Sequence, residues 1–235
     1  MLGCHPENVL YSRKYRVRGI INRVGAGKYG QVYVGCLKPS CKVPIIVKKS
    51  KDDMTKEYRI MKKAYSLVPK HVVQPYYFVK CRTGSIIYQE YFPQGTLSSN
   101  PKKITLSAIL QILTTLYILQ KNGIKHNDVH LKNILVDGKR VVLTDFGLAN
   151  IVEPGYSRNY GIGAKSNPGY DYHMFLNLVN ELRIPRISRV IERILPPEYL
   201  GLESPKVYNY RLRYSVDHSR LPSLASVIKM LTYNK

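Results

Sequence analysis

The stretch that decides the fold is HNDVHLKN, residues 126–133, together with DFG at residues 145–147. These two segments carry the carboxylates of Asp128 and Asp145 and the carboxamide of Asn133. The runs ILV and VVL lie between them, and we predict that they pair as a small hairpin around an Asp-Gly turn. The pattern therefore places the three side chains on two short turns flanked by strands.

Oxygen-bearing side chains in this pattern indicate phosphoryl-transfer chemistry. Mg²⁺ takes oxygen ligands, and the transfer also needs a group that orients the attacking hydroxyl. The spacing D-x4-N, followed after a hairpin by D-F-G, supplies both. Polar turn residues are the ordinary alternative, and DFG alone would not exclude it. The combined spacing, with the motifs upstream, favours the phosphoryl-transfer interpretation.

Composition limits the classes of protein to which the chain can belong. Its 235 residues suffice for one large domain or two small lobes, and 44% of them are hydrophobic. We find no apolar run of the ~18–20 residues that span a bilayer and no signal peptide. The four cysteines have no C-x2-C spacing, so we expect neither zinc nor a disulfide framework, and a reducing compartment.

The charge is strongly and unevenly positive. The formal net charge is +22, and residues 1–82 carry 18 basic and 4 acidic residues, which gives this third a net charge of +14. Such a surface attracts nucleic acid, an anionic membrane or an acidic protein. An ordinary solvated basic surface explains the composition equally well.

A glycine-rich segment, VGAGKYGQV at residues 24–32, lies within a stretch that we predict to be strand, turn and strand over residues 17–34. Glycines allow backbone N–H groups to approach phosphate oxygens closely. The G-x-G-x-x-G spacing is also found in dinucleotide-binding units. Two features oppose that alternative: the residues after the glycines are typical of a strand, and no acidic residue follows at the required distance.

The next strand, predicted over residues 43–48, places Ile46 and Lys48 on one face. Lys49 is the competing lysine, but the alternation of side chains points it to the other face. We predict a helix over residues 50–67, with Ser50 and Asp53 at its start. Glu57 is the only carboxylate in the body of that helix, and we expect it to pair with Lys48.

The remaining elements follow from apolar periodicity. Strands are predicted over residues 71–80 and 85–92, and the turn at residues 93–96 is the expected boundary between two lobes. Residues 104–122 predict a long buried helix that ends at Gly123. After a loop to about residue 168, further helices are predicted over residues 169–182, 185–195 and 222–231.

In this order the motifs are a glycine-rich turn, a strand lysine, a helix glutamate, H-x-D-x4-N and D-F-G, and the chain resembles the protein kinase family over roughly residues 17–180. The resemblance implies an α+β, two-lobed fold, with a small antiparallel sheet and one helix in the N-lobe and a reduced, mainly helical C-lobe. We expect a single domain over residues 1–235, with the N-lobe at about 16–92, a hinge at about 90–95 and the C-lobe at about 96–235.

The resemblance also implies roles for the matching residues. Asp128 would be the catalytic base, with His130 or Lys132 near the transferred phosphate. Asn133 and Asp145 would bind Mg²⁺, and Asp171 would brace the catalytic loop. ATP would be bound by residues of the first lobe, with backbone groups of Glu90 and Phe92 at the adenine: Val24, Gly25, Gly27, Lys28, Gly30, Val32, Ile46, Lys48, Glu57, Gln89, Glu90 and Phe92.

Several positions depart from the family pattern. Serine/threonine kinases usually have lysine where this chain has His130, whereas a cation at Lys132 is similar to many tyrosine kinases. Asn127 replaces an arginine that commonly pairs with a phosphorylated activation loop, so we predict activity without loop phosphorylation. No A-P-E motif precedes Asp171. The compactness resembles the small kinases of large DNA viruses and the casein-kinase and vaccinia-related kinases.

We predict that the chain is an ATP- and Mg²⁺-dependent protein kinase, and we favour serine or threonine over tyrosine as the acceptor. The alternatives are a pseudokinase or basic scaffold that binds protein or nucleic acid, and a small-molecule kinase on the same fold. Predicted partners are a protein substrate, which the basic charge suggests is acidic, and nucleic acid through the N-terminal third. The expected location is intracellular, in cytoplasm or nucleus, and for a viral protein the virion or host cell; the oligomeric state stays open.

Overall fold

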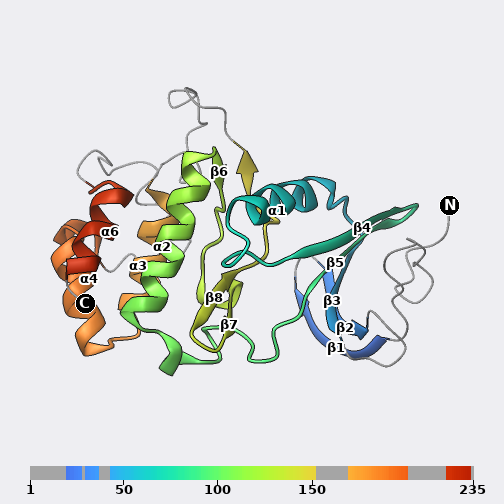
Figure 1. Ribbon diagram of the computed structural model, residues 1–235, viewed down its shortest axis with the longest axis horizontal. Coiled ribbons are helices and arrows are strands. Elements are labelled where there is room, and N and C mark those ends of the chain that lie inside the picture. Colours follow the sequence, from blue (N-terminus) through green and yellow to red (C-terminus); the bar gives the residue numbers. More distant parts are fainter. Residues whose placement is uncertain (1–19, 28–29, 37–42, 152–168, 201–220, 234–235) are drawn as a thin grey trace. The chain divides into compact units, whose positions relative to one another are not determined.

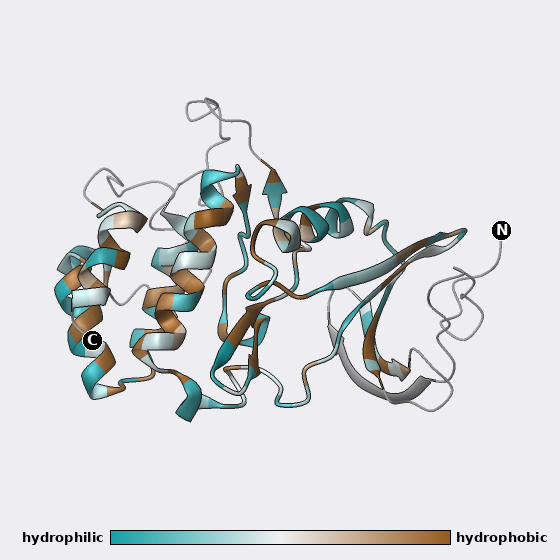
Figure 2. Cartoon of the chain, in the orientation of Figure 1, coloured by the Kyte–Doolittle hydropathy of each residue, from teal (hydrophilic) through white to brown (hydrophobic). Residues whose placement is uncertain are grey.

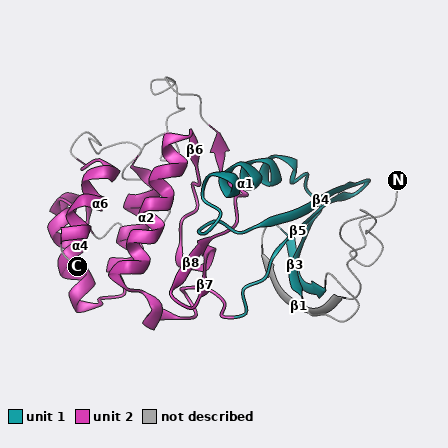
Figure 3. Cartoon of the chain, in the orientation of Figure 1, with its two compact units in different colours: residues 1–93 teal, residues 94–235 magenta. Residues whose placement is uncertain are grey.

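The computed structural model of the chain describes residues 20–27, 30–36, 43–151, 169–200 and 221–233, the first of these segments by its backbone alone. The chain divides into two compact units, residues 1–93 and 94–235 (Figure 3). The predicted α+β class is confirmed, because unit 1 holds a sheet with a helix and unit 2 is mainly helical (Figure 1). The assignment of both units to one domain with a hinge between them stays a prediction.

Unit 1 is built on a five-stranded antiparallel sheet with the strand order β1, β2, β3, β5, β4. The strands were predicted from their β-branched and aromatic residues and from the turn residues between them, and each is present. Their bounds are β1 Ile20–Gly27, β2 Gly30–Cys36, β3 Pro44–Ser50, β4 Pro75–Cys81 and β5 Gly84–Glu90.

The helix of unit 1, α1 (Thr55–Leu67), begins five residues later than predicted. Ser50 still belongs to β3, where it lies opposite Ser85 of β5. The Oγ of Ser50 accepts a hydrogen bond from Asp52 N–H, and Asp53 Oδ1 accepts one from Thr55 N–H. Ladder pairing of Ser50 therefore outweighs its preference for a helix start. The N-cap position is Met54, and no side chain caps it, so the capping expected from Ser50 and Asp53 is wrong.

The two faces of the sheet differ in chemistry. One face carries an apolar cluster of buried side chains that includes Ile45, Val47, Ile86 and Tyr88. Alternation along β3 sends Lys48 to the opposite face, on the side of α1. The buried stripe of α1 has helical spacing, with Glu57 followed by the apolar side chains Ile60, Met61 and Ala64.

Unit 2 is dominated by helices that pack around α2, which is apolar over much of its surface (Figures 1 and 2). The predicted long helix is confirmed, and Thr105 Oγ1 caps its start by accepting a hydrogen bond from Ala108 N–H at 3.1 Å. The helices predicted near the C-terminus are also present. The bounds are α2 Leu106–Lys121, α3 Tyr170–Asn180, α4 Pro185–Ile194 and α6 Leu224–Tyr233.

Short elements complete unit 2. The predicted hairpin is confirmed, with β7 (Ile134–Asp137) paired to β8 (Arg140–Leu143). A second pair, β6 (Ile124–Lys125) with β9 (Asn150–Ile151), was not predicted because two-residue strands have no periodicity. Among the described residues, three 3₁₀ turns were also missed: η1 Pro101–Lys103, η2 Leu131–Asn133 and η4 Pro197–Tyr199.

The cysteines overturn one expectation. Cys36 and Cys81 both lie within described strands, and both are disulfide-bonded. The expectation of no disulfides came from chain length, which does not prevent a bridge wherever two thiols come within reach. No helix among the described residues has the length and apolar character needed to cross a membrane.

Candidate active site

In unit 1 the structure joins Lys48 of β3 to Glu57 of α1. The Lys48 Nζ lies 2.7 Å from the Glu57 Oε1, and the two residues are only 8% and 7% exposed. The predicted ion pair is therefore present, while Lys49 is half-buried at the next position of β3. A charge with so little access to water needs a partner of opposite sign, so the pair fixes the ammonium group at one place above the sheet.

The glycine-rich segment forms the hairpin of β1 and β2, in which Gly25 lies opposite Val32 and Gly27 lies opposite Gly30. Gly30 has a φ of +144°, and a Cβ at this position would lie 2.2 Å from the backbone oxygen of Lys49. The neighbouring strand therefore requires glycine here, before any ligand is considered. Val24 lies in β1, and Lys28 falls outside the described residues.

The other residues predicted to bind nucleotide lie at one end of the same sheet. Ile46 of β3 lies opposite Gln89 of β5, whose side chain is buried. The Glu90 N–H donates a hydrogen bond to the Gln74 carbonyl oxygen at 2.9 Å, so the adenine contact predicted for Glu90 would have to use its carbonyl oxygen. Phe92 is buried.

In unit 2 the segment before Asp128 is held by the carboxylate of Asp171 in α3. Its Oδ2 accepts a hydrogen bond from His126 N–H at 2.9 Å, and its Oδ1 accepts one from Asn127 N–H at 2.8 Å. Asn127 has a φ of +63°, a conformation that non-glycine residues rarely adopt. Two charge-assisted hydrogen bonds to consecutive amides stabilise that turn, which is the bracing expected of Asp171.

His126 is fully buried, and its ring packs against Phe146 with 4.8 Å between the ring centroids. Its Nε2 lies 3.0 Å from the Thr144 carbonyl oxygen, and its Nδ1 accepts a hydrogen bond from Asp128 N–H at 3.3 Å. Because a carbonyl oxygen can only accept a hydrogen bond, Nε2 carries the proton. Because Nδ1 accepts a hydrogen bond, it carries none, and the imidazole is neutral. Burial lowers the pKa of His126, in agreement with the neutral form.

The Asp128 carboxylate is oriented by Asn133. The Nδ2 of Asn133 donates to Asp128 Oδ2 at 2.9 Å and to the Asp128 backbone oxygen at 3.0 Å. The Nε2 of His130 lies 3.5 Å from the same Oδ2. Because both hydrogen bonds of Asn133 use its amide nitrogen, its Oδ1 is the atom that can bind a cation.

The β7–β8 hairpin brings Asn133 and Asp145 to the same end of two paired strands. The Thr144 N–H donates to the Asn133 backbone oxygen at 3.0 Å, which extends the ladder beyond the Ile134–Leu143 pair. Asp145 follows directly, with a φ of +62°, and its Oδ1 accepts a hydrogen bond from Gly147 N–H at 3.3 Å. The confirmed hairpin therefore places both residues on turns flanked by paired strands, as the sequence predicted.

Carboxylate and carboxamide oxygens suit Mg²⁺, which is commonly held by one or two carboxylates together with water and the phosphates of a substrate. The described residues contain no cluster of three histidine, cysteine or acidic side chains that could hold a metal alone. Asn133 and Asp145 therefore fit a Mg²⁺ ion that is bound together with a phosphate-bearing substrate, rather than a permanent metal centre.

Two features of unit 2 went unrecognised in the sequence. Asn127, treated as a replacement for an arginine, is buried and donates from Nδ2 to the Leu148 carbonyl oxygen at 3.0 Å, so it ties the segment before Asp128 to the segment after DFG. Lys125 is buried, and burial lowers its pKa to about 8, while the nearby Asp171 acts in the opposite direction. No motif marks either contact, because both depend on segments distant in sequence.

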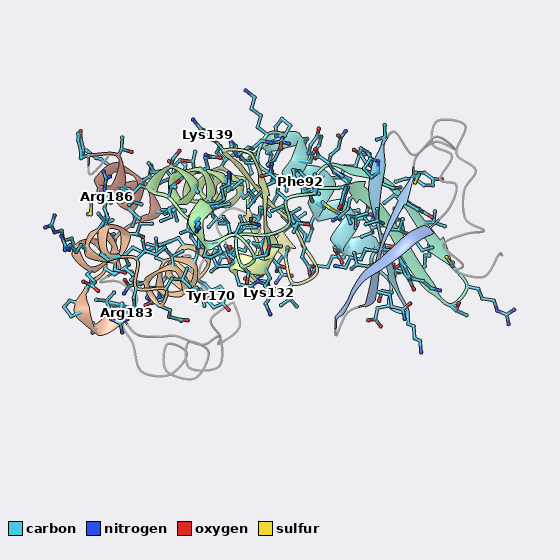
Figure 4. All side chains as sticks on the ribbon, turned by 90° about the horizontal axis from the view of Figure 1, so that it is seen from below. Phe92, Lys132, Lys139, Tyr170, Arg183 and Arg186 are labelled. Carbon is cyan, nitrogen blue, oxygen red and sulfur yellow. The ribbon has the colours of Figure 1, made fainter. Side chains whose placement is uncertain are left out.

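The structure thus assembles the predicted residues in two groups, one in each unit. Lys48 and Glu57 are joined in unit 1, and Asp128, Asn133 and His130 are in contact in unit 2. Lys132 is exposed, and its side chain extends from unit 2 (Figure 4). The nucleotide- and metal-binding roles of these residues stay predictions.

Comparison with known proteins gives one family and a set of relatives. Residues 19–167 match the protein kinase domain family, a span that includes every predicted site residue from Val24 to Asp145 and ends before Asp171. Mitogen-activated protein kinase kinase kinase 3 of Arabidopsis thaliana is 29% identical over 173 residues, which cover 64% of this chain and 26% of the relative.

Of two further relatives, one is named as a tyrosine kinase and the other is not. Tyrosine-protein kinase ABL2 of Homo sapiens is 30% identical over 144 residues, covering 56% of this chain and 12% of the relative. Casein kinase II subunit alpha' of Saccharomyces cerevisiae is 29% identical over 173 residues, covering 67% of this chain and 49% of the relative. The matched region therefore spans less than half of the length of each of these relatives.

Proposed function

The chain belongs to the protein kinase family, and on that premise we propose that it is an enzyme that transfers the γ-phosphoryl group of ATP to a hydroxyl group of a protein. Mg²⁺ is the proposed metal ion. The relatives are named as kinases, and the side chains that the reaction requires are all present in the sequence. The predicted assignment as a kinase thus rests on family and on residues together.

The proposed roles follow from the contacts of each residue. Lys48, fixed by Glu57, binds the phosphates of ATP, and the Gly25–Gly30 region of the hairpin covers them with backbone N–H groups. When bound, Mg²⁺ would neutralise charge on the phosphates, and Asn133 and Asp145 would hold it.

Asp128 orients the acceptor hydroxyl and takes its proton. Its Oδ2 accepts a hydrogen bond from the Asn133 amide, which orients the carboxylate and cannot itself take up the proton. This contact between the proposed base and the proposed metal ligand is the observation that carries the proposal, because it couples the orientation of two groups that act on the same phosphoryl transfer.

The acceptor is proposed to be serine or threonine. The relative named as a tyrosine kinase and the casein kinase II relative have similar sequence identity to this chain, 30% and 29%. The support is local: His130, at the position where serine/threonine kinases usually have lysine, lies 3.5 Å from the Asp128 carboxylate, whereas Lys132 is exposed on unit 2. Placement among the small kinases of DNA viruses, nucleic-acid binding and an intracellular location stay predictions.

The test is transfer of radiolabelled phosphate from ATP to casein and to a poly(Glu,Tyr) copolymer, measured for wild type, Asp128→Asn and Asp145→Asn. We expect labelled phosphoserine or phosphothreonine with wild type and loss of at least about 100-fold in each variant. The exposed Asp137→Asn is the matched control and should retain wild-type activity. Wild-type protein that binds Mg·ATP but labels no acceptor, itself included, would favour the pseudokinase alternative.

A further inference from the structure

The described cysteines of unit 1 lie at opposite ends of its sheet. Cys36 ends β2 and Cys81 ends β4, and both are disulfide-bonded. Cys36 lies opposite Pro44, the first residue of β3, whereas Cys81 lies opposite Gly84, one residue past the far end of the β3–β5 ladder. About seven residue steps of ~3.3 Å, or ~23 Å, separate them along the strands, whereas the Cα atoms of a disulfide lie within ~7 Å of each other. The two cysteines are therefore not bonded to each other.

The same two cysteines also lie on opposite faces of the sheet. Cys81 belongs to the apolar cluster that includes Val47. Cys36 shares a face with its partner Pro44 and, by alternation along β3, with Lys48, whose side chain points to α1. A disulfide between them would have to pass through the sheet, so each is bonded to another cysteine of the chain.

The chain has two other cysteines, Cys4 and Cys41, and both lie outside the described residues. Cys41 is three residues before Pro44, so their Cα atoms can be at most about 11 Å apart. Pro44 is itself ~25 Å from Cys81, since about seven steps along the strands and two strand spacings of ~4.8 Å separate them. At least ~14 Å therefore remains between Cys41 and Cys81, about twice the span of a disulfide. Cys4 is left as the partner of Cys81, and Cys41 as the partner of Cys36.

We name the buried cluster around Cys81 the apolar face of the sheet, and its residues are Ile45, Val47, Cys81, Ile86 and Tyr88. All of them except Cys81 are at most 1% exposed. Helix α1 packs beside β4 on the other face, where Tyr58 stacks on Phe78 with 5.3 Å between the ring centroids (Figure 1). Phe78 lies on the same face as Lys48. Helix α1 therefore does not cover the apolar face, and contact of such a face with water would be unfavourable.

The connection from Cys4 to the sheet has to run from one corner of the sheet to the other. It joins β1 at Ile20, which lies opposite Gly35 at the end of the sheet where Cys36 lies, and β1 and β4 are the two edge strands. About six steps along the strands and four strand spacings put Ile20 ~28 Å from Cys81. The chain from Cys4 to Ile20 can span up to ~53 Å, so it is long enough to cross the sheet.

We propose that the apolar face of the sheet is the binding surface for the N-terminal segment of this chain, residues 5–19, and that a Cys4–Cys81 disulfide fastens the segment across it. The segment offers apolar and aromatic side chains for this contact, Val9, Leu10, Tyr11, Tyr15 and Val17. Strand β3 carries Val47 toward the segment and Lys48 on its other side, so the segment supports the strand that holds this lysine. The proposal does not depend on the proposed function.

Peptide mapping tests the pairing on the wild-type chain. The protein is oxidised in a glutathione buffer, alkylated without reduction, digested with trypsin and analysed by mass spectrometry. We expect residues 1–13 joined to residues 81–82, and an internal bridge within residues 29–42. A link between Cys81 and residues 29–42, or unbonded Cys81, would overturn the proposal. A disulfide-bonded dimer on a non-reducing gel would overturn it in favour of a second copy of the chain.

Two matched variants test whether the segment covers the apolar face. Cys4→Ser/Cys81→Ser removes the proposed fastening, and Cys36→Ser/Cys41→Ser is the control that removes the other bridge. We expect the fluorescence of a dye that binds exposed apolar surface, anilinonaphthalene sulfonate, to rise at least about threefold in the first variant and less than about 1.5-fold in the control. The fall in Tm should be about twice as large in the first variant, because residues 4–81 close a much longer loop than residues 36–41.

Reduction of the wild-type chain gives an independent measurement. Dithiothreitol converts each disulfide to two thiols and is itself oxidised to a cyclic disulfide, so it should raise dye fluorescence as far as Cys4→Ser/Cys81→Ser does. Fluorescence that is unchanged in that variant, or that rises equally in the control, would overturn the covering role. The peptide map uses the wild-type chain, so it decides the pairing even if a variant fails to fold.

Discussion

Replacement of Asp171 by asparagine is the most informative test of the catalytic-loop geometry. The carboxylate accepts hydrogen bonds from two consecutive amides, His126 N–H at 2.9 Å and Asn127 N–H at 2.8 Å. The carboxamide of Asp171→Asn has one acceptor oxygen, so it can satisfy one amide while its NH₂ group faces the other. The variant therefore loses one charge-assisted hydrogen bond and leaves a donor in a largely buried segment without its acceptor.

The two effects together are expected to lower the free energy of unfolding by about 2–4 kcal/mol. For a chain of this length that corresponds to a fall in Tm of about 4–16 °C, since each kcal/mol shifts Tm by about 2–4 °C. Phosphotransfer should fall by more than about tenfold, because the Asp128 carboxylate follows the braced turn directly.

The assay is thermal melting followed by circular dichroism, with Asp137→Asn as the matched control. Asp137 also accepts a short hydrogen bond, from Arg140 Nη2 at 2.7 Å, but on the surface, where an ion pair contributes about 0–1 kcal/mol. A loss below about 0.5 kcal/mol for Asp171→Asn, or a loss equal to that of the control, would refute the bracing role.

Three other predictions follow from single contacts. Gly30→Ala should lower the free energy of unfolding in urea by about 2–4 kcal/mol, because the added Cβ would meet the Lys49 carbonyl oxygen. Gly138 also has a positive φ but has open space around it, so Gly138→Ala should lower it by only about 1–2 kcal/mol. Equal losses in the two variants would contradict the close approach at Gly30. Lys125 has a folded-state pKa of about 8, below its ordinary value of 10.5, so the unfolded chain binds this proton more tightly than the folded chain does. The free energy of unfolding should therefore rise by about 1–2 kcal/mol between pH 8 and 10.5. This rise should be absent in Lys125→Met, and the same rise in that variant would show that Lys125 is not its source. Because Asn127 bonds to a backbone carbonyl rather than to a phosphate, phosphatase treatment should leave activity unchanged, and an active preparation that loses activity on this treatment would show the prediction to be wrong.

The sequence predicted elements with strong periodicity and missed those without it. Helix α2 was placed within two residues at each end, because its apolar stripe repeats over four turns and Gly123 marks its end. The pair β6–β9 has two residues in each strand, too few for any alternation to be seen. The start of α1 was placed too early because Ser50 suits both a helix cap and a strand, and pairing with Ser85 decides between them.

In the candidate site, the sequence likewise predicted some contacts and missed others. Glu57 was paired correctly with Lys48, since the helix body offers no other carboxylate. The neutral, buried ring of His126 and the bond from Asn127 to Leu148 were missed, because a motif names residues and not the distant backbone groups that they meet. The prediction that the chain has no disulfides failed for a different reason: chain length is a statistical guide and does not indicate which thiols approach each other.

The central proposal is that Lys48 binds the phosphates of ATP and that Asn133 and Asp145 bind Mg²⁺, and calorimetric titration of ATP tests these roles most directly. Wild type, Lys48→Met and Asp145→Asn would each be titrated with and without Mg²⁺. The account predicts that Mg²⁺ strengthens binding at least about tenfold in wild type, that Asp145→Asn abolishes this effect, and that Lys48→Met weakens binding with or without the metal ion. Equal affinity for ATP in all three proteins, with no dependence on Mg²⁺, would contradict it.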